Sequence, residues 1–240
     1  MNWEKLNERA YTPYSGQPKS CLIESETGIL YPGVTIENLS YPLTITPLQA
    51  AICSCLADRS IPKCYYSPNG PQPGDQYWID EYQLNTEIVS DLPERTYYQP
   101  LKPSGFDILG RLKEIADQAV TPNSGFPVSV LLEVENGWIE GVNVEQSSWN
   151  LGLCAERVAL SRAIAGGYHQ FHRLILFAPL GDFITPCGGC RQILGEWMRE
   201  QRVEIRNRDN TRVTYRVTEL MPYAFMASGL KNRSSEESES

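Results

Sequence analysis

The sequence predicts an α/β fold in which one arrangement of helices and strands occurs twice. Two segments carry the repeat: residues 12–16 recur as residues 121–125, and residues 33–40 recur as residues 141–148. The offsets are 109 and 108 residues, so the register between the copies is almost kept. Because two separate segments agree in order and spacing, we interpret the chain as a duplication.

The second copy begins with a predicted helix over residues 106–119, followed by two strands. Residues 128–134 and 138–144 form the strand patterns, and Asn136-Gly137 between them is a residue pair favoured in tight hairpins. The helix is indicated by the spacing of four apolar residues: Ile108, Leu112, Ile115 and Ala119.

Helices and strands alternate through the rest of the second copy. Residues 154–165 are alanine-rich and helical in pattern, and residues 174–178 form a short apolar strand. A second helix is predicted over residues 187–199, and late strands over residues 203–206 and 213–217.

The first copy starts in the same way but loses its pattern after a helix around residues 49–57. The segment that follows is rich in Pro, Gly, Asn, Asp and Tyr, which is typical of irregular structure. We therefore predict a degenerate repeat over residues 1–64, an irregular connector over 65–100, a catalytic domain over 101–229 and a disordered acidic Ser/Glu tail over 230–240.

Composition and charge exclude several classes of partner. The 240 residues are 41% apolar, which is enough for a core, and the net charge of -8 would repel the phosphate backbone of a nucleic acid. No apolar stretch resembles a secretory signal or a membrane span. We expect a cytoplasmic protein that binds neither nucleic acid nor membrane, in which the seven cysteines are not a disulfide framework.

Three of these cysteines stand at the start of two predicted helices. Cys187 and Cys190 form a Cys-x-x-Cys pair, which alone fits a redox pair or half of a structural metal site. Cys154 opens the other helix, and helix N-termini stabilise thiolates. Three thiolates without a fourth protein ligand leave one tetrahedral position open for water, so we predict one catalytic Zn²⁺ per chain.

Glu156 follows the first of these cysteines by two residues and is the predicted general acid/base. Its carboxylate could take a proton from the bound water and deliver protons to a ring nitrogen and a leaving amine. Three thiolates leave the metal centre negative, and we expect Arg157 and the two helix termini to offset this charge by donating to the sulfurs.

With these residues the chain resembles the cytidine deaminase family. The motifs that match the signature of zinc nucleobase deaminases are Cys-Ala-Glu-Arg at residues 154–157 and Pro-Cys-Gly-Gly-Cys-Arg-Gln at residues 186–192. The first ligand is Cys where the signature has His, which resembles the branch that acts on free nucleosides. The resemblance implies a three-layer αβα fold with a mixed sheet flanked by helices.

The resemblance also implies residues that bind the substrate. Phe126 would pack on the pyrimidine, while Asn143 and Glu145 would hold the ribose hydroxyls. Alternate residues of a strand share a face, so this amide and this carboxylate could grip one hydroxyl pair. The resemblance further implies an assembly, either a tetramer of small subunits or a dimer of duplicated ones. We therefore expect a homodimer in which Tyr41 and Phe225 reach a neighbouring pocket or, alternatively, belong to the core.

The first copy departs from this pattern at its helix start. At an offset of 108, Thr46, Pro47 and Leu48 stand where Cys154, Ala155 and Glu156 stand in the second copy. The remaining cysteines of this region, Cys53, Cys55 and Cys64, fit either buried core residues or a second zinc site, and we favour the core. The first copy is therefore predicted to be a non-catalytic partner of the second.

The leading functional hypothesis is hydrolytic deamination of cytidine and deoxycytidine to uridine and deoxyuridine, with release of ammonia, in pyrimidine salvage. One alternative keeps the chemistry but changes the substrate to a modified cytosine nucleoside, a nucleotide or a nucleoside antibiotic. Another is a non-catalytic zinc-binding protein that retains the fold, but a structural cysteine site would have no use for Glu156.

Overall fold

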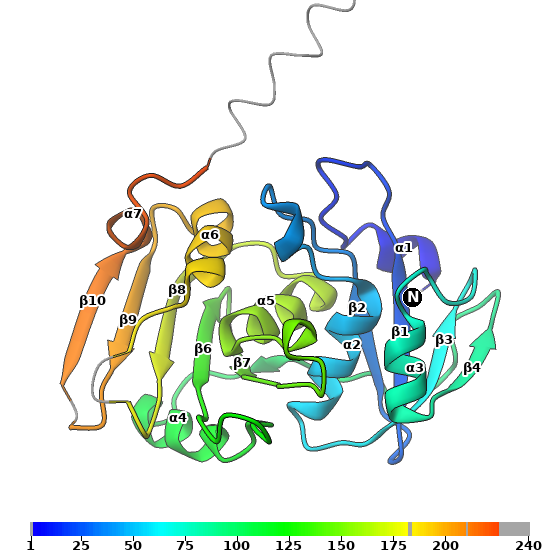
Figure 1. Cartoon of the computed structure of the whole chain (residues 1–240), viewed down its shortest axis with the longest axis horizontal. Coiled ribbons are helices and arrows are strands. Elements are labelled where there is room, and N and C mark those ends of the chain that lie inside the picture. Colours follow the sequence, from blue (N-terminus) through cyan, green and yellow to red (C-terminus); the bar gives the residue numbers. More distant parts are fainter. Residues whose placement is uncertain (1, 182–183, 210, 226–240) are drawn as a thin grey trace, which may run out of the picture.

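Two β-sheets stand side by side, with helices α2 and α5 packed against each other between them (Figure 1). The structure is a computed structural model that describes residues 2–181, 184–209 and 211–225. The tail predicted over residues 230–240 lies outside the described residues. No helix in the described ranges is long and apolar enough to cross a membrane.

The first sheet has four strands in the order β2-β1-β3-β4, with β3 parallel to β4 and the other pairs antiparallel. Its elements in chain order are α1 (Trp3–Asn7), β1 (Ser20–Ser25), β2 (Leu30–Val34), the 3-10 helix η1 (Tyr41–Leu43), α2 (Pro47–Leu56), β3 (Pro62–Ser67), α3 (Gln76–Tyr82) and β4 (Asn85–Ile88).

The second sheet has six strands in the order β10-β9-β8-β6-β7-β5, with β8 parallel to β9. Its elements are β5 (Leu101–Lys102), α4 (Ile108–Ala116), β6 (Ser129–Val134), β7 (Gly137–Val142), the 3-10 helix η2 (Trp149–Leu151), α5 (Ala155–Gly166), β8 (Phe171–Phe177), α6 (Gly188–Trp197), β9 (Arg202–Arg206), β10 (Arg212–Arg216) and α7 (Val217–Leu220).

Neighbouring residues of β7 show that helices cover both faces of this sheet. Gly141 faces α5 so closely that a Cβ there would overlap the carbonyl oxygen of Ala155. Glu140, which points to the opposite face, pairs with Arg111 of α4. Because successive strand residues point to opposite faces, α4 and α5 lie on different sides of the sheet. The predicted three-layer α/β fold is confirmed.

The first copy extends further than the sequence indicates. Residues 65–100 were expected to be irregular, but they contain α3 and β4, which complete the first sheet in the order seen for β7-β6-β8-β9. Only Trp78 of α3 is buried and every residue of β4 is exposed, so neither element shows an apolar period. The structured first copy therefore reaches Ile88, beyond the predicted boundary at residue 64.

The repeated segments serve the same local purpose in both copies. Gly33, the counterpart of Gly141, faces α2 with the same lack of room for a Cβ. Glu37 accepts hydrogen bonds from the backbone N–H groups of Tyr14 and Ser15 at 2.9 and 3.1 Å. Its counterpart Glu145 accepts from Asn123 and Ser124 at the same two distances. The two copies therefore share equivalent individual hydrogen bonds as well as equivalent strands and helices.

The two copies contact each other through reciprocal hydrogen bonds. Gln49 Nε2 of α2 donates to the carbonyl oxygen of Leu151 at 2.8 Å, and Arg157 Nη2 of α5 donates to that of Leu43 at 3.0 Å. Gln49 and Arg157 are 108 residues apart, and so are Leu43 and Leu151. Such an exchange of equivalent contacts is the mark of a twofold-related interface. An approximate twofold axis therefore relates the two copies.

Candidate metal centre and active site

Three cysteines of the second copy meet where two helices begin. Cys154 is the N-cap of α5, Cys187 is the N-cap of α6, and Cys190 lies in the first turn of α6. Their Sγ atoms all lie within 4.8 Å of one another, and those of Cys154 and Cys187 are 3.8 Å apart. Two sulfurs on one tetrahedral zinc are separated by about 3.8 Å. The donor set and its spacing therefore fit Zn²⁺.

The surroundings of these thiols favour thiolate at one of them in particular. Hydrogen bonds from the Cys154 and Cys190 thiols lower the pKa of Cys187, and backbone N–H groups of α6 add to this effect. The Cys190 backbone N donates to Cys187 Sγ at 3.4 Å. Exposed helix N–H groups thus face the sulfur, as expected for a metal-binding thiolate at a helix N-terminus.

Glu156 lies beside the cysteines with its carboxyl group buried. The residue is only 6% exposed, and burial raises the pKa of Glu156 to about 7. It lines a cavity of about 400 Å³ together with Cys154 and Cys187. A carboxyl group with such a pKa can both accept and release a proton near neutral pH.

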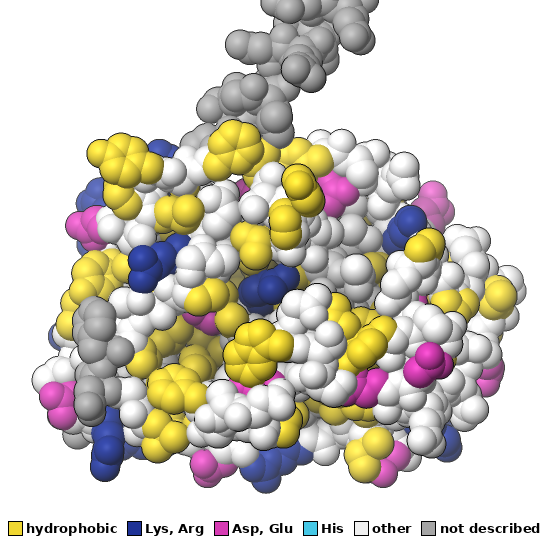
Figure 2. All heavy atoms as spheres, in the orientation of Figure 1, with side chains coloured by type: hydrophobic (Ala, Val, Ile, Leu, Met, Phe, Trp, Pro, Cys, Tyr) yellow, Lys and Arg dark blue, Asp and Glu magenta, His cyan; other side chains and the backbone are white. Residues whose placement is uncertain are grey.

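The rest of this cavity is mainly apolar. Figure 2 shows hydrophobic side chains gathered around a hollow over β6 and β8. Phe126, predicted to pack on a pyrimidine ring, is 37% exposed and lines the cavity. The other lining residues are Val128, Asn143, Ala155, Leu176, Ile184 and Thr185. The cavity therefore combines an apolar surface, which suits a flat ring, with the buried carboxyl group of Glu156.

Asn143 lines this cavity, and Asn143 and Glu145 both hold the loop before β6. The Asn143 side chain accepts from the Val128 N–H at 2.7 Å and donates to the Phe126 carbonyl at 2.9 Å. Burial by itself would raise the pKa of Glu145, but hydrogen bonds from Ser124 and Asn123 lower it overall. Glu145 lines an adjoining cavity of about 200 Å³ that shares Asn143 and Cys154.

Arg157 has a different partner from the one the sequence suggested. Among the described residues its guanidinium donates to the Leu43 carbonyl of the first copy and makes no hydrogen bond to a cysteine sulfur. Its Nε is buried without a partner. A Cβ on Gly189, between Cys187 and Cys190, would lie 3.0 Å from Leu43 Cδ2. The first copy thus reaches the edge of the cysteine cluster through Leu43.

Glu196 of α6 is a contact that the sequence did not reveal. Tyr11 and Tyr14 donate their hydroxyls to its Oε1 at 3.0 and 2.7 Å. The Asn38 amide and the Leu39 N–H donate to Oε2 at 2.8 and 3.0 Å. All four donors belong to the first copy, so this copy holds the helix that carries two of the three cysteines.

The aromatic residues predicted to reach a neighbour are both exposed. Tyr41 is 85% exposed and Phe225 is 59% exposed. The alternative placement in the core is therefore wrong. Phe225 is tied to α6 through its backbone, because Gln192 Nε2 donates to its carbonyl at 3.1 Å.

Among its described residues, the first copy holds no equivalent of the cysteine cluster. Thr46 caps α2 by accepting from the Gln49 N–H at 3.2 Å, and Leu48 is buried at the position of Glu156. Cys53, Cys55 and Cys64 are free and buried, as the core interpretation predicted. Within the described residues, the three cysteines of the second copy are the one group of acidic, His and Cys side chains placed to hold a metal.

Comparison with known proteins assigns both copies to one family. Two models, each described as cytidine and deoxycytidylate deaminase zinc-binding region, match residues 107–205 and residues 4–63. A cytidine deaminase of Sporosarcina psychrophila is 33% identical over 120 residues, which cover 49% of this chain and 88% of that protein. A cytidine deaminase of Mycoplasma genitalium is 30% identical over 123 residues, covering 50% of this chain and 95% of that protein.

A solved structure is also similar to part of the chain. The crystal structure of cytidine deaminase from Burkholderia pseudomallei has 32% sequence identity and a TM-score of 0.47. The match covers 49% of this chain and 96% of that one.

Proposed function

This chain belongs to the cytidine and deoxycytidylate deaminase family, and we propose that it hydrolyses the exocyclic amine of cytidine and deoxycytidine. Water is consumed, and the products are uridine or deoxyuridine and ammonia. One observation carries the proposal: Glu156, a buried carboxyl group whose pKa is raised to about 7 by burial, shares a cavity with the cysteine cluster. A cysteine site that served structure alone would not need this group.

One Zn²⁺ per chain would be held by the sulfurs of Cys154, Cys187 and Cys190. When bound, the metal polarises water and so makes it a better nucleophile at neutral pH. Glu156 would accept one proton from the attacking water and donate it to the ring nitrogen, then accept the second proton from the added hydroxyl group and donate it to the departing amine. Its burial in the cavity excludes bulk water from these transfers.

Three further residues would position the nucleoside. Phe126 offers a ring face at the cavity edge, while Asn143 and Glu145 are held by the loop before β6 where they can meet ribose hydroxyls. After its two contacts, the Asn143 amide keeps one N–H and one lone pair for a ligand.

The described lining of the cavity favours a free nucleoside over a nucleotide. None of its described residues is Lys or Arg, and Glu145 stands in the adjoining cavity. A phosphate would therefore meet a carboxylate without a compensating cation. The alternative substrates with an intact phosphate are disfavoured for this reason.

Assembly and cellular role are part of the same proposal. The exposed side chains of Tyr41 and Phe225 support a homodimer that covers them. A role in pyrimidine salvage follows from the proposed reaction, and the cytoplasmic location stays a prediction from the sequence.

The proposal is tested by incubating the purified chain with cytidine, deoxycytidine and cytidine monophosphate and measuring ammonia and bound zinc. We expect zinc near one per chain and turnover of both nucleosides, with little turnover of the monophosphate. Turnover of the monophosphate alone would contradict the nucleoside assignment. A zinc-loaded chain without turnover of any of the three would contradict the enzyme assignment.

A further inference from the structure

One pair of equivalent residues lies on the approximate twofold axis itself. Ser54 of α2 and Arg162 of α5 are 108 residues apart and contact each other directly. Arg162 Nε donates to Ser54 Oγ at 3.1 Å, and Arg162 Nη2 donates to the Ser54 carbonyl at 2.7 Å. A residue that contacts its own counterpart must stand at the axis of an isologous interface.

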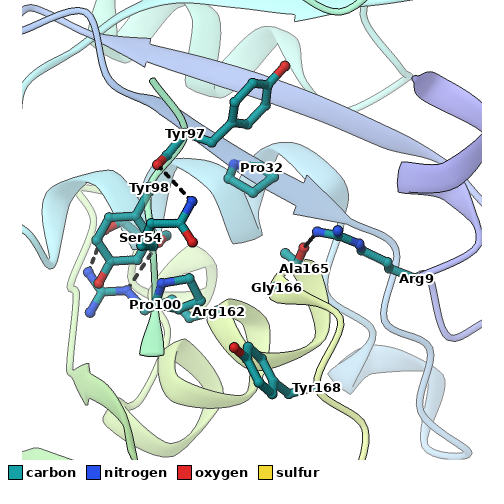
Figure 3. A pocket seen from close by; sticks show the side chains of 11 residues that line it. Arg9, Pro32, Ser54, Tyr97, Tyr98, Pro100, Arg162, Ala165, Gly166 and Tyr168 are labelled. Carbon is teal, nitrogen blue, oxygen red and sulfur yellow. Dashed lines mark hydrogen bonds between the residues drawn. The ribbon is translucent and has the colours of Figure 1, made fainter. Parts of the chain in front are cut away.

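The charge at this axis has no carboxylate partner. Arg162 is only 5% exposed, and its third hydrogen bond goes to the Glu140 carbonyl at 3.0 Å. The Tyr98 ring lies beside it, with its centroid 4.9 Å from the guanidinium carbon (Figure 3). Among the described residues no ion pair includes Arg162. The buried cation is therefore held by neutral acceptors and a ring face alone.

The other side of the axis holds a cavity in place of a side chain. Pro32 is the counterpart of Glu140, and together with Ser54 it lines a cavity of about 240 Å³. The same cavity is lined by Arg162 and by Arg9, which donates to the Ala165 carbonyl at 2.6 Å (Figure 3). The approximate twofold axis relates this space to the one that the Arg162 guanidinium fills in the second copy. In the first copy the equivalent residue is Ser54, whose side chain is too short to fill it.

We propose that the Ser54–Arg162 pair decides which copies can face each other across α2 and α5. The face accepts a first copy opposite a second copy, either within one chain or by exchange between two chains. Two second copies would bring two buried guanidiniums together at the axis, which is strongly unfavourable without a counter-charge. A homodimer of chains that do not exchange copies must therefore form through another face.

The test uses four variants of the full chain: Ser54→Arg, Ser54→Met, Arg162→Ser and the double variant of Ser54→Arg with Arg162→Ser. Ser54→Arg adds a second cation at the axis, next to Arg9, and should lower Tm on the order of 10 °C. Ser54→Met adds a chain of similar length without charge and should lower Tm by less than half as much. Arg162→Ser alone should also lower Tm, because it leaves carbonyl groups unpaired.

The decisive result is a change of sign. Arg162→Ser should raise Tm when it is added to Ser54→Arg, although it lowers Tm in the native chain. If Ser54→Arg does not fold, recovery of folded protein in the double variant carries the same information. The proposal would be overturned if Arg162→Ser lowered Tm both in the native chain and in Ser54→Arg. It would also be overturned if Ser54→Arg were as stable as the native chain, or if the double variant failed to fold as well.

Discussion

The two copies share a scaffold and differ in chemistry. Both place a glycine of the second strand against a helix, and both hold a loop through a glutamate, Glu37 in one and Glu145 in the other. At the helix start, however, the first copy has Thr46 and Leu48 where the second has Cys154 and Glu156. The first copy also lacks a counterpart of the Cys187–Cys190 pair. A few side chains at two helix N-termini thus separate a supporting domain from a candidate metal centre on the same scaffold.

Exchanging the residue at the helix start should have the largest effect. Cys154→Thr gives the second copy the cap of the first, and we expect it to lose zinc and to lower turnover by roughly 10³-fold or more. Thr46→Cys is the matched variant and should change neither, because the first copy has no Cys-x-x-Cys pair to complete a site. Zinc content and ammonia release measure both. Zinc retained in Cys154→Thr would place the ligands elsewhere.

The second exchange concerns the carboxyl group two residues on. Glu156→Gln should keep zinc but lower kcat by about 10²- to 10⁴-fold, since the amide cannot carry a proton between water and the leaving amine. Leu48→Met at the equivalent position of the first copy is the control and should leave kcat unchanged. Near-native kcat in Glu156→Gln would remove the residue from its proposed role.

The paired glutamates allow a finer test. Glu145→Gln and Glu37→Gln each weaken hydrogen bonds from the same two loop N–H groups, so both should lower Tm by a few degrees. Only Glu145→Gln should also raise KM for cytidine, by roughly 10-fold, because a ribose contact is lost. Equal KM values in the two variants would reduce Glu145 to the loop-holding role of Glu37.

The smallest effect is expected where the first copy holds α6. Burial and the nearby Glu196 raise the pKa of Tyr11 to about 12 from its ordinary 10.0. Because the unfolded chain releases this proton first, stability present below pH 10 is lost as the pH rises from 10 toward 12. In Glu196→Gln the pKa of Tyr11 should fall, and the stability lost over that range should be smaller. Phenolate absorbance measures the pKa, and an unchanged value would show that burial alone sets it.

The clustering of the three cysteines could be predicted from the sequence because its signals are local. Cys154, Glu156 and the Cys187–Cys190 pair each stand at a helix start, and helix starts can be read from short windows. Longer-range features were not predictable in this way. Glu196 contacts partners 157 to 185 residues away, and nothing near it in the sequence marks it. Arg157 was expected to donate to a cysteine sulfur, but its guanidinium donates to a carbonyl of the other copy. The elements α3 and β4 were missed because they bury too little to show a period.

The contact of Leu43 with the edge of the cysteine cluster has a consequence for how the protein responds to dilution. In an assembly of separate subunits, a residue supplied by a neighbour is lost when the subunits dissociate. Here the chain itself connects Leu43 to the cysteines, which keeps the two at a high effective concentration at any protein level. This part of the active site should therefore remain complete in a single chain at the lowest concentrations, and specific activity that depends on Leu43 should not fall as the protein is diluted.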